Sequence, residues 1–271
     1  MARGRSQKGG SVGSTSRPAS RWFAALVVIV IAGLGLLALR KQPVAAPYVG
    51  QYDNMRLAAP AGSAWSSSAK FGVWDTGRFD VYNNEWNTAQ AGPQLVWADS
   101  YHHWGVQSIQ PGSTSVKTYP SVQLNFPNSA LSSVTSLTST FAQAMPPAKL
   151  SYDAEAAYDL WLDNYKIEVM VWVANHGQTP LGGVINHVVV GGRRYAVYQG
   201  GPDVFSFVAL GKPASTGQVD LLSMLNWLVR HRHLSGSDQL NQVNFGWEIA
   251  STNGVPLNFA VTDYSLTTNV Q

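Results

Sequence analysis

The sequence has no cysteine and few charged residues, and each scarcity excludes a class of protein. Without cysteine, the 271-residue chain has no disulfide, no thiolate metal ligand and no cysteine nucleophile. The domain must therefore be stabilised by its hydrophobic core, which its length allows. Charged residues make up 12% of the chain and aromatic residues 11%, with ten Trp and eleven Tyr. An uncharged polar surface with many aromatic residues is typical of secreted carbohydrate-active proteins.

Basic residues are concentrated at the N-terminus. Seven of the 18 Lys and Arg residues, and none of the 15 Asp and Glu residues, lie in residues 1–41. This leaves eleven basic and fifteen acidic residues, a net charge of −4, for residues 42–271. Because a nucleic-acid-binding domain carries a basic patch on its folded part, we expect no nucleic-acid partner.

The composition changes three times before the main domain. Residues 1–21 contain Arg, Ser and Gly without periodicity, which predicts a disordered basic tail. Residues 22–39 carry no charge and span roughly 27 Å as a helix, so they form a transmembrane anchor or the apolar part of a cleaved signal peptide. Residues 40–69, rich in Ala, Pro and Ser, predict a linker. Either alternative places residues 70–271 outside the cytoplasm, as an extracellular or membrane-anchored domain, which cell fractionation checks.

Short apolar segments separated by turn residues recur along the main domain at intervals typical of a β-sandwich. The expected strands are residues 79–82, 95–98, 116–119, 122–126, 154–162, 166–173, 187–190, 193–198, 204–209, 242–249 and 257–265. Residues 218–233 instead place apolar residues at i, i+3, i+4 and i+7 from Leu221, which predicts one amphipathic helix. Its last histidines, His231 and His233, are interpreted as partners of the helix dipole, because no cluster of acidic ligands accompanies them. We expect no metal and no cofactor.

One acid, Glu168, interrupts the apolar stretch of residues 167–173. Side chains alternate across a strand, so Glu168, Met170 and Trp172 share one face and the aliphatic residues share the other. A carboxylate beside a thioether and an indole lines a ligand cleft more often than a solvated surface. The alternative is a salt bridge at the edge of a cleft.

A second strand, residues 244–250, repeats this pattern with Glu248 on its polar face. Of the four Glu in the chain, Glu168 and Glu248 stand in apolar runs, whereas Glu85 and Glu155 lie in more polar surroundings. Two carboxylates that face one cleft are the minimum equipment for glycoside hydrolysis. The spacing leaves open whether these two face the same cleft.

Seven motifs follow one another along the main domain: FDVYNNEW at residues 79–86, VKTY at 116–119, AYDL at 157–160, EVMVW at 168–172, GGRRY at 191–195, VFSFVA at 204–209 and FGWE at 245–248. In content and order they resemble glycoside hydrolase family 12 endoglucanases. The resemblance covers about residues 70–271. It implies an all-β jelly-roll sandwich of two curved antiparallel sheets with one helix and an open cleft.

The resemblance also implies roles for individual residues. Glu168 matches the nucleophile, Glu248 matches the general acid/base, and Asp159 matches the acid that contacts the nucleophile. The implied substrate-binding positions are Asn84, Trp86, Met170 and Trp172, with Trp86 as a stacking platform. The chain departs from the family where Asn87 replaces a usual Gly and where Trp247 precedes the acid/base, and these departures concern the shape of the subsites.

The implied activity is retaining endo-hydrolysis of β-1,4-glucosidic bonds in cellulose-like or mixed-linkage β-glucans. Two alternatives stay open: an endo-hydrolase specific for xyloglucan, and a non-catalytic jelly roll that binds β-glucan. We expect a monomer whose partner is a β-glucan polysaccharide, and which meets the membrane through residues 22–39 if they are not cleaved. Release of reducing ends from β-glucans separates the enzyme from the binding module.

Overall fold

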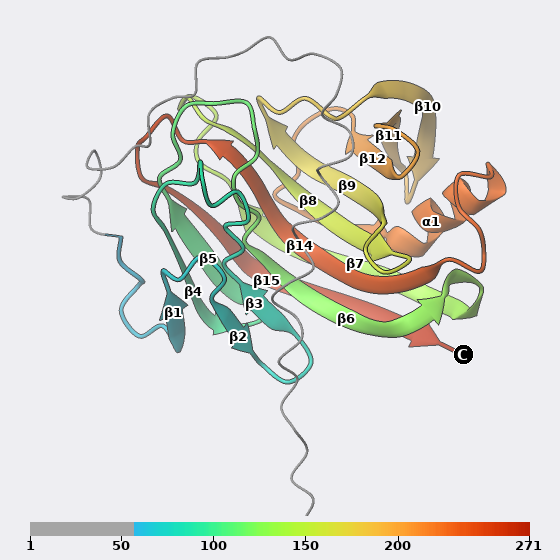
Figure 1. Ribbon diagram of the computed structural model, residues 1–271, viewed down its shortest axis with the longest axis horizontal. Helices are drawn as coiled ribbons and strands as arrows, with labels where there is room; N and C mark the ends of the chain where they lie inside the picture. Colours follow the sequence, from blue (N-terminus) through green and yellow to red (C-terminus); the bar gives the residue numbers. More distant parts are fainter. Residues whose placement is uncertain (1–56) are drawn as a thin grey trace, which may run out of the picture.

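Two β-sheets pack face to face in the computed structural model, which describes residues 57–271 (Figure 1). The expected basic tail, residues 1–21, and the expected membrane or signal segment, residues 22–39, lie outside the described residues. Within residues 57–271, no helix is long and apolar enough to cross a bilayer.

The smaller sheet has six strands in the order β1-β4-β5-β15-β7-β13. Its strands are β1 (Trp65–Ser67), β4 (Gln94–Ser100), β5 (His103–Ser108), β7 (Val134–Ala144), β13 (Thr216–Asp220) and β15 (Leu257–Val270). β1 falls within residues 40–69, which were expected to form a linker. It pairs with β4, and its Trp65 stacks on Trp74 with 6.1 Å between ring centroids. The folded region therefore begins ahead of the expected boundary at residue 70.

The larger sheet has nine strands in the order β10-β11-β12-β9-β8-β14-β6-β3-β2. Its strands are β2 (Val73–Asp75), β3 (Asp80–Tyr82), β6 (Ser121–Ala130), β8 (Asp153–Leu162), β9 (Ile167–His176), β10 (Gly183–Val190), β11 (Arg193–Gln199), β12 (Val204–Ala209) and β14 (Gln239–Ser251). Residues 116–119, expected as a strand, make only an isolated bridge between Thr118 and Ile249.

One strand pair departs from the expected antiparallel arrangement, since β12 runs parallel to β9. After β9, the chain forms the β10–β11 hairpin at the edge of the sheet and returns through β12 to lie beside β9. Gly191 and Gly192 connect the hairpin with φ angles of 56° and 78°. Positive φ at both positions of a two-residue loop suits the twist of the flanking strands and favours glycine.

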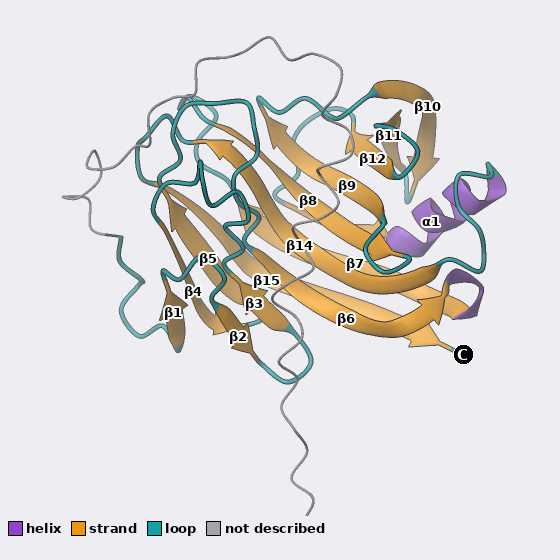
Figure 2. Ribbon diagram, in the orientation of Figure 1, coloured by secondary structure: helices purple, strands orange, loops and turns teal. Residues whose placement is uncertain are grey.

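The one α-helix within residues 57–271, α1 (Leu221–Arg230), is shorter at both ends than the expected 218–233 (Figure 2). β13 extends to Asp220, whose side chain then caps the helix by accepting a hydrogen bond from the Ser223 backbone N–H at 2.9 Å. A 3₁₀ turn, η2 (Leu131–Ser133), joins β6 to β7. Met224 and Trp227 of the helix pack into the core, since they are 1% and 9% exposed.

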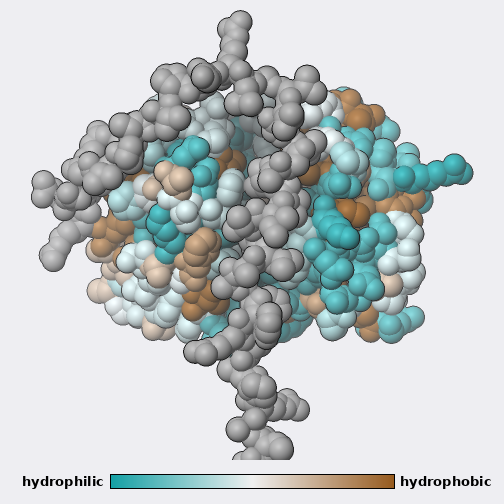
Figure 3. Space-filling view, in the orientation of Figure 1, coloured by the Kyte–Doolittle hydropathy of each residue, from teal (hydrophilic) through white to brown (hydrophobic). Residues whose placement is uncertain are grey.

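The core lies between the two sheets and is rich in aromatic residues. Trp247 of β14 is fully buried, contacts Trp104 of β5 at 5.0 Å between centroids, and donates its indole N–H to Gln143 at 3.3 Å. Trp247, one of the two departures from the family pattern, therefore fills the core on the face opposite Glu248. Exposed hydrophobic side chains lie in small separate groups on the face seen in Figure 3.

Candidate active site

Strands β9, β8 and β14 lie side by side in the nine-stranded sheet (Figure 1). Val169, Val171 and Val173 belong to the core between the sheets, so Glu168 points the other way. We call this the open face, meaning the face of the nine-stranded sheet that is turned away from the six-stranded sheet. The alternation expected for this strand is confirmed.

The same alternation puts three further acids on the open face. In β14, Phe245, Trp247 and Ile249 lie in the core, so Glu248 faces outward. In β8, Ala156 and Tyr158 lie in the core, so Glu155 and Asp159, which alternate with them, also face outward. Four carboxyl groups from three adjacent strands therefore gather on one surface.

The first pair of carboxyl groups is Asp159 and Glu168, which lie on neighbouring strands close enough for each to shift the pKa of the other. Two ionised carboxylates repel each other and offer no hydrogen, so a hydrogen bond within the pair needs a proton on one of them. Burial, followed by the charge of Glu248, raises the pKa of Glu168 to about 8. Burial, followed by the charges of Glu168 and Glu248, raises the pKa of Asp159 well above its usual range. The expected role of Asp159 as the acid that contacts the nucleophile stays a prediction.

The second pair is Glu155 and Glu248, which lie directly opposite each other across the β8–β14 ladder. Their side chains are close enough for a hydrogen bond, which forms only if one of the two carries a proton. Burial raises the pKa of Glu248, whereas the bond from Glu155 lowers it. Burial and the Glu248 charge raise the pKa of Glu155 well above its usual range. The site thus contains two pairs of acids, each of which needs a proton.

Tyr119 closes one side of the site, which the sequence interpretation did not predict. Its hydroxyl donates a hydrogen bond to the Ala157 carbonyl at 3.1 Å. Burial first, and then the charges of Asp159 and Glu248, raise the pKa of Tyr119 well above its usual range. Tyr119 ends the VKTY motif, so the motif was the only sequence signal for its position.

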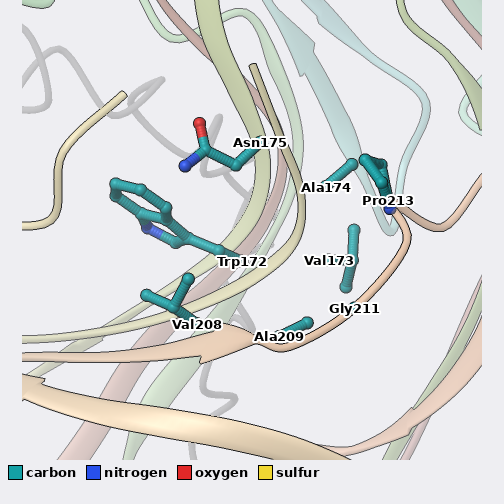
Figure 4. A pocket seen from close by; sticks show the side chains of 8 residues that line it. All are labelled: Trp172, Val173, Ala174, Asn175, Val208, Ala209, Gly211 and Pro213. Carbon is teal, nitrogen blue, oxygen red and sulfur yellow. The ribbon is translucent and has the colours of Figure 1, made fainter. Parts of the chain in front are cut away.

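Met170 and Trp172 form the floor of the open face. They make a small apolar cluster with Ala157 and Val208, separate from the main core. Their side chains are 5% and 4% exposed, so they present little surface. A small hollow lies beside Trp172, where Asn175 of the same strand and Val208 of β12 contribute to its wall (Figure 4).

Asn84 and Trp86 lie in the loop after β3, next to the segment that carries Tyr119. Asn84 has a left-handed backbone with φ of 41°, and its carbonyl accepts hydrogen bonds from the Tyr119 N–H and the Thr118 hydroxyl. Trp86 is half-buried and stands outside the main hydrophobic core. Asn87, the other departure from the family pattern, holds this loop by donating its side-chain amide to the Val116 carbonyl at 3.2 Å.

Two acids are more deeply buried than the sequence suggested. Glu85 and Glu155 were placed in polar surroundings, but they are 2% and 0% exposed. Glu85 accepts a hydrogen bond from Asn83 at 3.1 Å, and burial raises its pKa to about 7. The position of Glu155 four residues before Asp159 puts both on one face of the strand, and this spacing was the available signal. Within residues 57–271, no group of three or more His, Asp or Glu residues could hold a metal ion.

Comparison with known proteins identifies this arrangement. Residues 77–269 match glycosyl hydrolase family 12. The chain belongs to this family. It is therefore a glycoside hydrolase, and the resemblance seen in the sequence is confirmed.

Individual relatives of this family 12 chain agree in fold and in named activity. The xyloglucan-specific endo-β-1,4-glucanase A of Emericella nidulans is 32% identical over 217 residues, which cover 72% of this chain and 89% of the relative. The xyloglucanase domain of NopAA from Sinorhizobium fredii, solved in complex with cellobiose, is 29% identical with a TM-score of 0.69 and covers 76% of this chain and all of that domain. The family 12 xyloglucanase of Bacillus licheniformis, at 21% identity and a TM-score of 0.65, covers 76% of this chain and all of its own and shares the fold.

We predict that Trp86 binds sugar and contributes little to stability. An indole covers the apolar C–H face of a pyranose ring. Trp86→Ala should raise KM about 10-fold, which corresponds to about 1.4 kcal/mol, and leave Tm nearly unchanged. Trp74→Ala is the matched control, because Trp74 packs against the main core and should lower Tm without raising KM. A large fall in Tm for Trp86→Ala would assign Trp86 to the core instead.

We also predict that Glu85 makes the free energy of unfolding fall as pH rises. Its pKa of about 7 in the folded protein lies above the ordinary value of about 4.3. Between these pH values the folded protein binds a proton that the unfolded chain has released. The free energy of unfolding therefore falls as pH rises, by at most about 1.4 kcal/mol per pH unit.

Glu85→Gln should flatten this slope between about pH 4.5 and pH 7, as measured by urea unfolding across that range. Asp263→Asn is a control for the loss of a carboxyl group, since Asp263 is an exposed residue of β15 in the other sheet. An unchanged slope in Glu85→Gln would show that Glu85 ionises at its ordinary pH in the folded protein.

Proposed function

We propose that this protein hydrolyses internal β-1,4-glucosidic bonds of β-glucans with retention of configuration, with Glu168 as nucleophile and Glu248 as general acid/base. The observation that carries the proposal is the placing of these two acids on the open face, close enough for the charge of Glu248 to raise the pKa of Glu168. In a retaining glycosidase, two carboxyl groups stand about 5 Å apart so that one can attack while the other transfers a proton.

The nucleophile must be ionised when the acid/base carries its proton. A charge on Glu248 is the second cause of the raised pKa of Glu168, and this cause disappears when Glu248 is protonated. The hydrogen bond from Asp159 acts in the same direction, since it lowers the pKa of Glu168. Asp159 therefore holds the proton of its pair and leaves Glu168 free to attack.

The reaction then runs in two displacements. A Glu168 oxygen attacks the anomeric carbon while Glu248 gives its proton to the departing glycosidic oxygen, which forms a covalent glycosyl ester. Glu248, now ionised, takes a proton from water as the water oxygen attacks the same carbon and releases Glu168. Two inversions restore the β configuration.

The substrate is a β-1,4-linked glucan backbone, and the relatives favour xyloglucan among such glucans. Enzymes named as xyloglucan-specific endo-β-1,4-glucanases align with 72–77% of this chain. Asn84 and Trp86 on one side, with Met170 and Trp172 beneath, provide the polar and aromatic groups that sugar binding requires. Cellulose-like and mixed-linkage glucans share the same backbone linkage.

Glu168→Ala should lose turnover on every substrate, because no glycosyl ester can form. Glu248→Ala should keep the first step with an aryl glycoside whose leaving group needs no proton, and the ester should accumulate. Azide should then accelerate Glu248→Ala and yield a β-glycosyl azide, identified by NMR. A β-glycosyl azide from the Glu168 variant, with an α-glycosyl azide from the Glu248 variant, would reverse the two assignments, because a variant without its nucleophile reacts with azide by a single inversion. α-Configured products from the unmodified enzyme would exclude the retaining mechanism.

We expect reducing ends from xyloglucan, mixed-linkage β-glucan and carboxymethyl-cellulose, with xyloglucan cleaved fastest. Size-exclusion profiles of the polymers should show early loss of chain length, because cleavage is internal. Failure on xyloglucan with cleavage of the other two polymers would assign the enzyme to unbranched glucans. No release from any of the three would leave only the binding module.

A further inference from the structure

Glu155 is a buried carboxyl group, and the only hydrogen-bond donor that its described surroundings can offer is a protonated Glu248. The side chain is 0% exposed, and both carboxyl oxygens lack a conventional donor within the described residues. Its other cross-strand neighbour, Asn175 of β9, uses its amide for Gln178 at 2.8 Å. The Glu248 carboxyl, opposite Glu155 on β14, is the group that meets it.

The charged groups around this pair do not neutralise it. Asp153 and Asp159 of β8 and Glu248 itself add negative charge. Lys117, from the segment beside β14, donates to the Ala250 and Ser115 carbonyls instead, and burial lowers its pKa to about 8. Like charges directly opposite each other in a sheet are destabilising, and burial increases the cost. A shared proton removes this repulsion.

We propose that Glu155 is a positioning residue for Glu248. Glu155 shares one proton with Glu248 and thereby sets the upper pH limit of catalysis. The proposal rests on the proposed function, since it assigns Glu248 the general acid role. Glu155, being fully buried, retains the shared proton and donates its O–H to the Glu248 carboxylate. This donation fixes the orientation of Glu248 and stabilises its ionised form.

The effect on catalysis follows from the proton count of the pair. General acid catalysis needs the proton on Glu248, which the doubly protonated pair provides. Loss of the first proton leaves a strong O–H to carboxylate bond, so it occurs at a lower pH than for an acid without such a partner. When Glu248 gives its proton to the glycosidic oxygen, the same bond stabilises the carboxylate that forms.

The test is the pH dependence of kcat/KM for Glu155→Gln. A Gln side chain has the shape of the protonated acid, but its N–H is a weaker donor to carboxylate than an O–H. The upper limb of the profile should therefore move to higher pH, by about one unit. Asp99→Asn, which removes an exposed carboxyl group from the other sheet, should leave the limb in place.

An upper limb at the same pH in Glu155→Gln and in the unmodified enzyme would overturn the proposal, while activity itself would still support the proposed function. If Glu155→Gln does not reach the native fold, Glu155→Asp and Glu155→Asn provide the same comparison, because Asp and Asn have side chains of equal length and differ only as acid and amide. The Asp variant should keep the limb closer to that of the unmodified enzyme, and the Asn variant should move it upward. Equal limbs in these two variants would also contradict the proposal, whereas an inactive unmodified enzyme would contradict the proposed function.

Discussion

The structure depends on one electrostatic constraint, which is that four buried or half-buried carboxyl groups share one face of a β-sheet. Burial is the first cause of the raised pKa of all four, and among the described residues no Lys or Arg lowers any of these values. The acids must therefore share protons in pairs. In the proposed mechanism, this arrangement separates the tasks of catalysis, because each pair then contains one acid that reacts and one that holds a proton.

The core makes this arrangement possible by fixing the strands that carry the acids. The residues that alternate with Glu248 are Phe245, Trp247 and Ile249, all fully buried between the sheets. Val169, Val171 and Val173, which alternate with Glu168, are also fully buried. A shift of register by one residue would place acids in the core and aromatic residues on the open face, so packing specifies the register strongly.

Alternation explains which parts could be predicted from the sequence. β9 and β14 were predictable because each carries an unbroken apolar face opposite a single acid. β7 was missed because Ser139 and Gln143 occupy core positions, where the Tyr158 hydroxyl and the Trp247 indole satisfy them. Such partners come from other strands and leave no trace in the local sequence. Glu155 was misjudged for the same reason, because its partner lies 93 residues later in the chain.

The most direct test of the paired acids uses the small number of glutamates. The chain has only Glu85, Glu155, Glu168 and Glu248, so ¹³C labelling of glutamate side-chain carboxyl groups gives four resonances. Titration by NMR should show Glu155 and Glu248 changing together in two steps, with Glu155 still protonated well above its ordinary pKa of about 4.3. Independent single steps for Glu155 and Glu248 near that ordinary value would contradict the account.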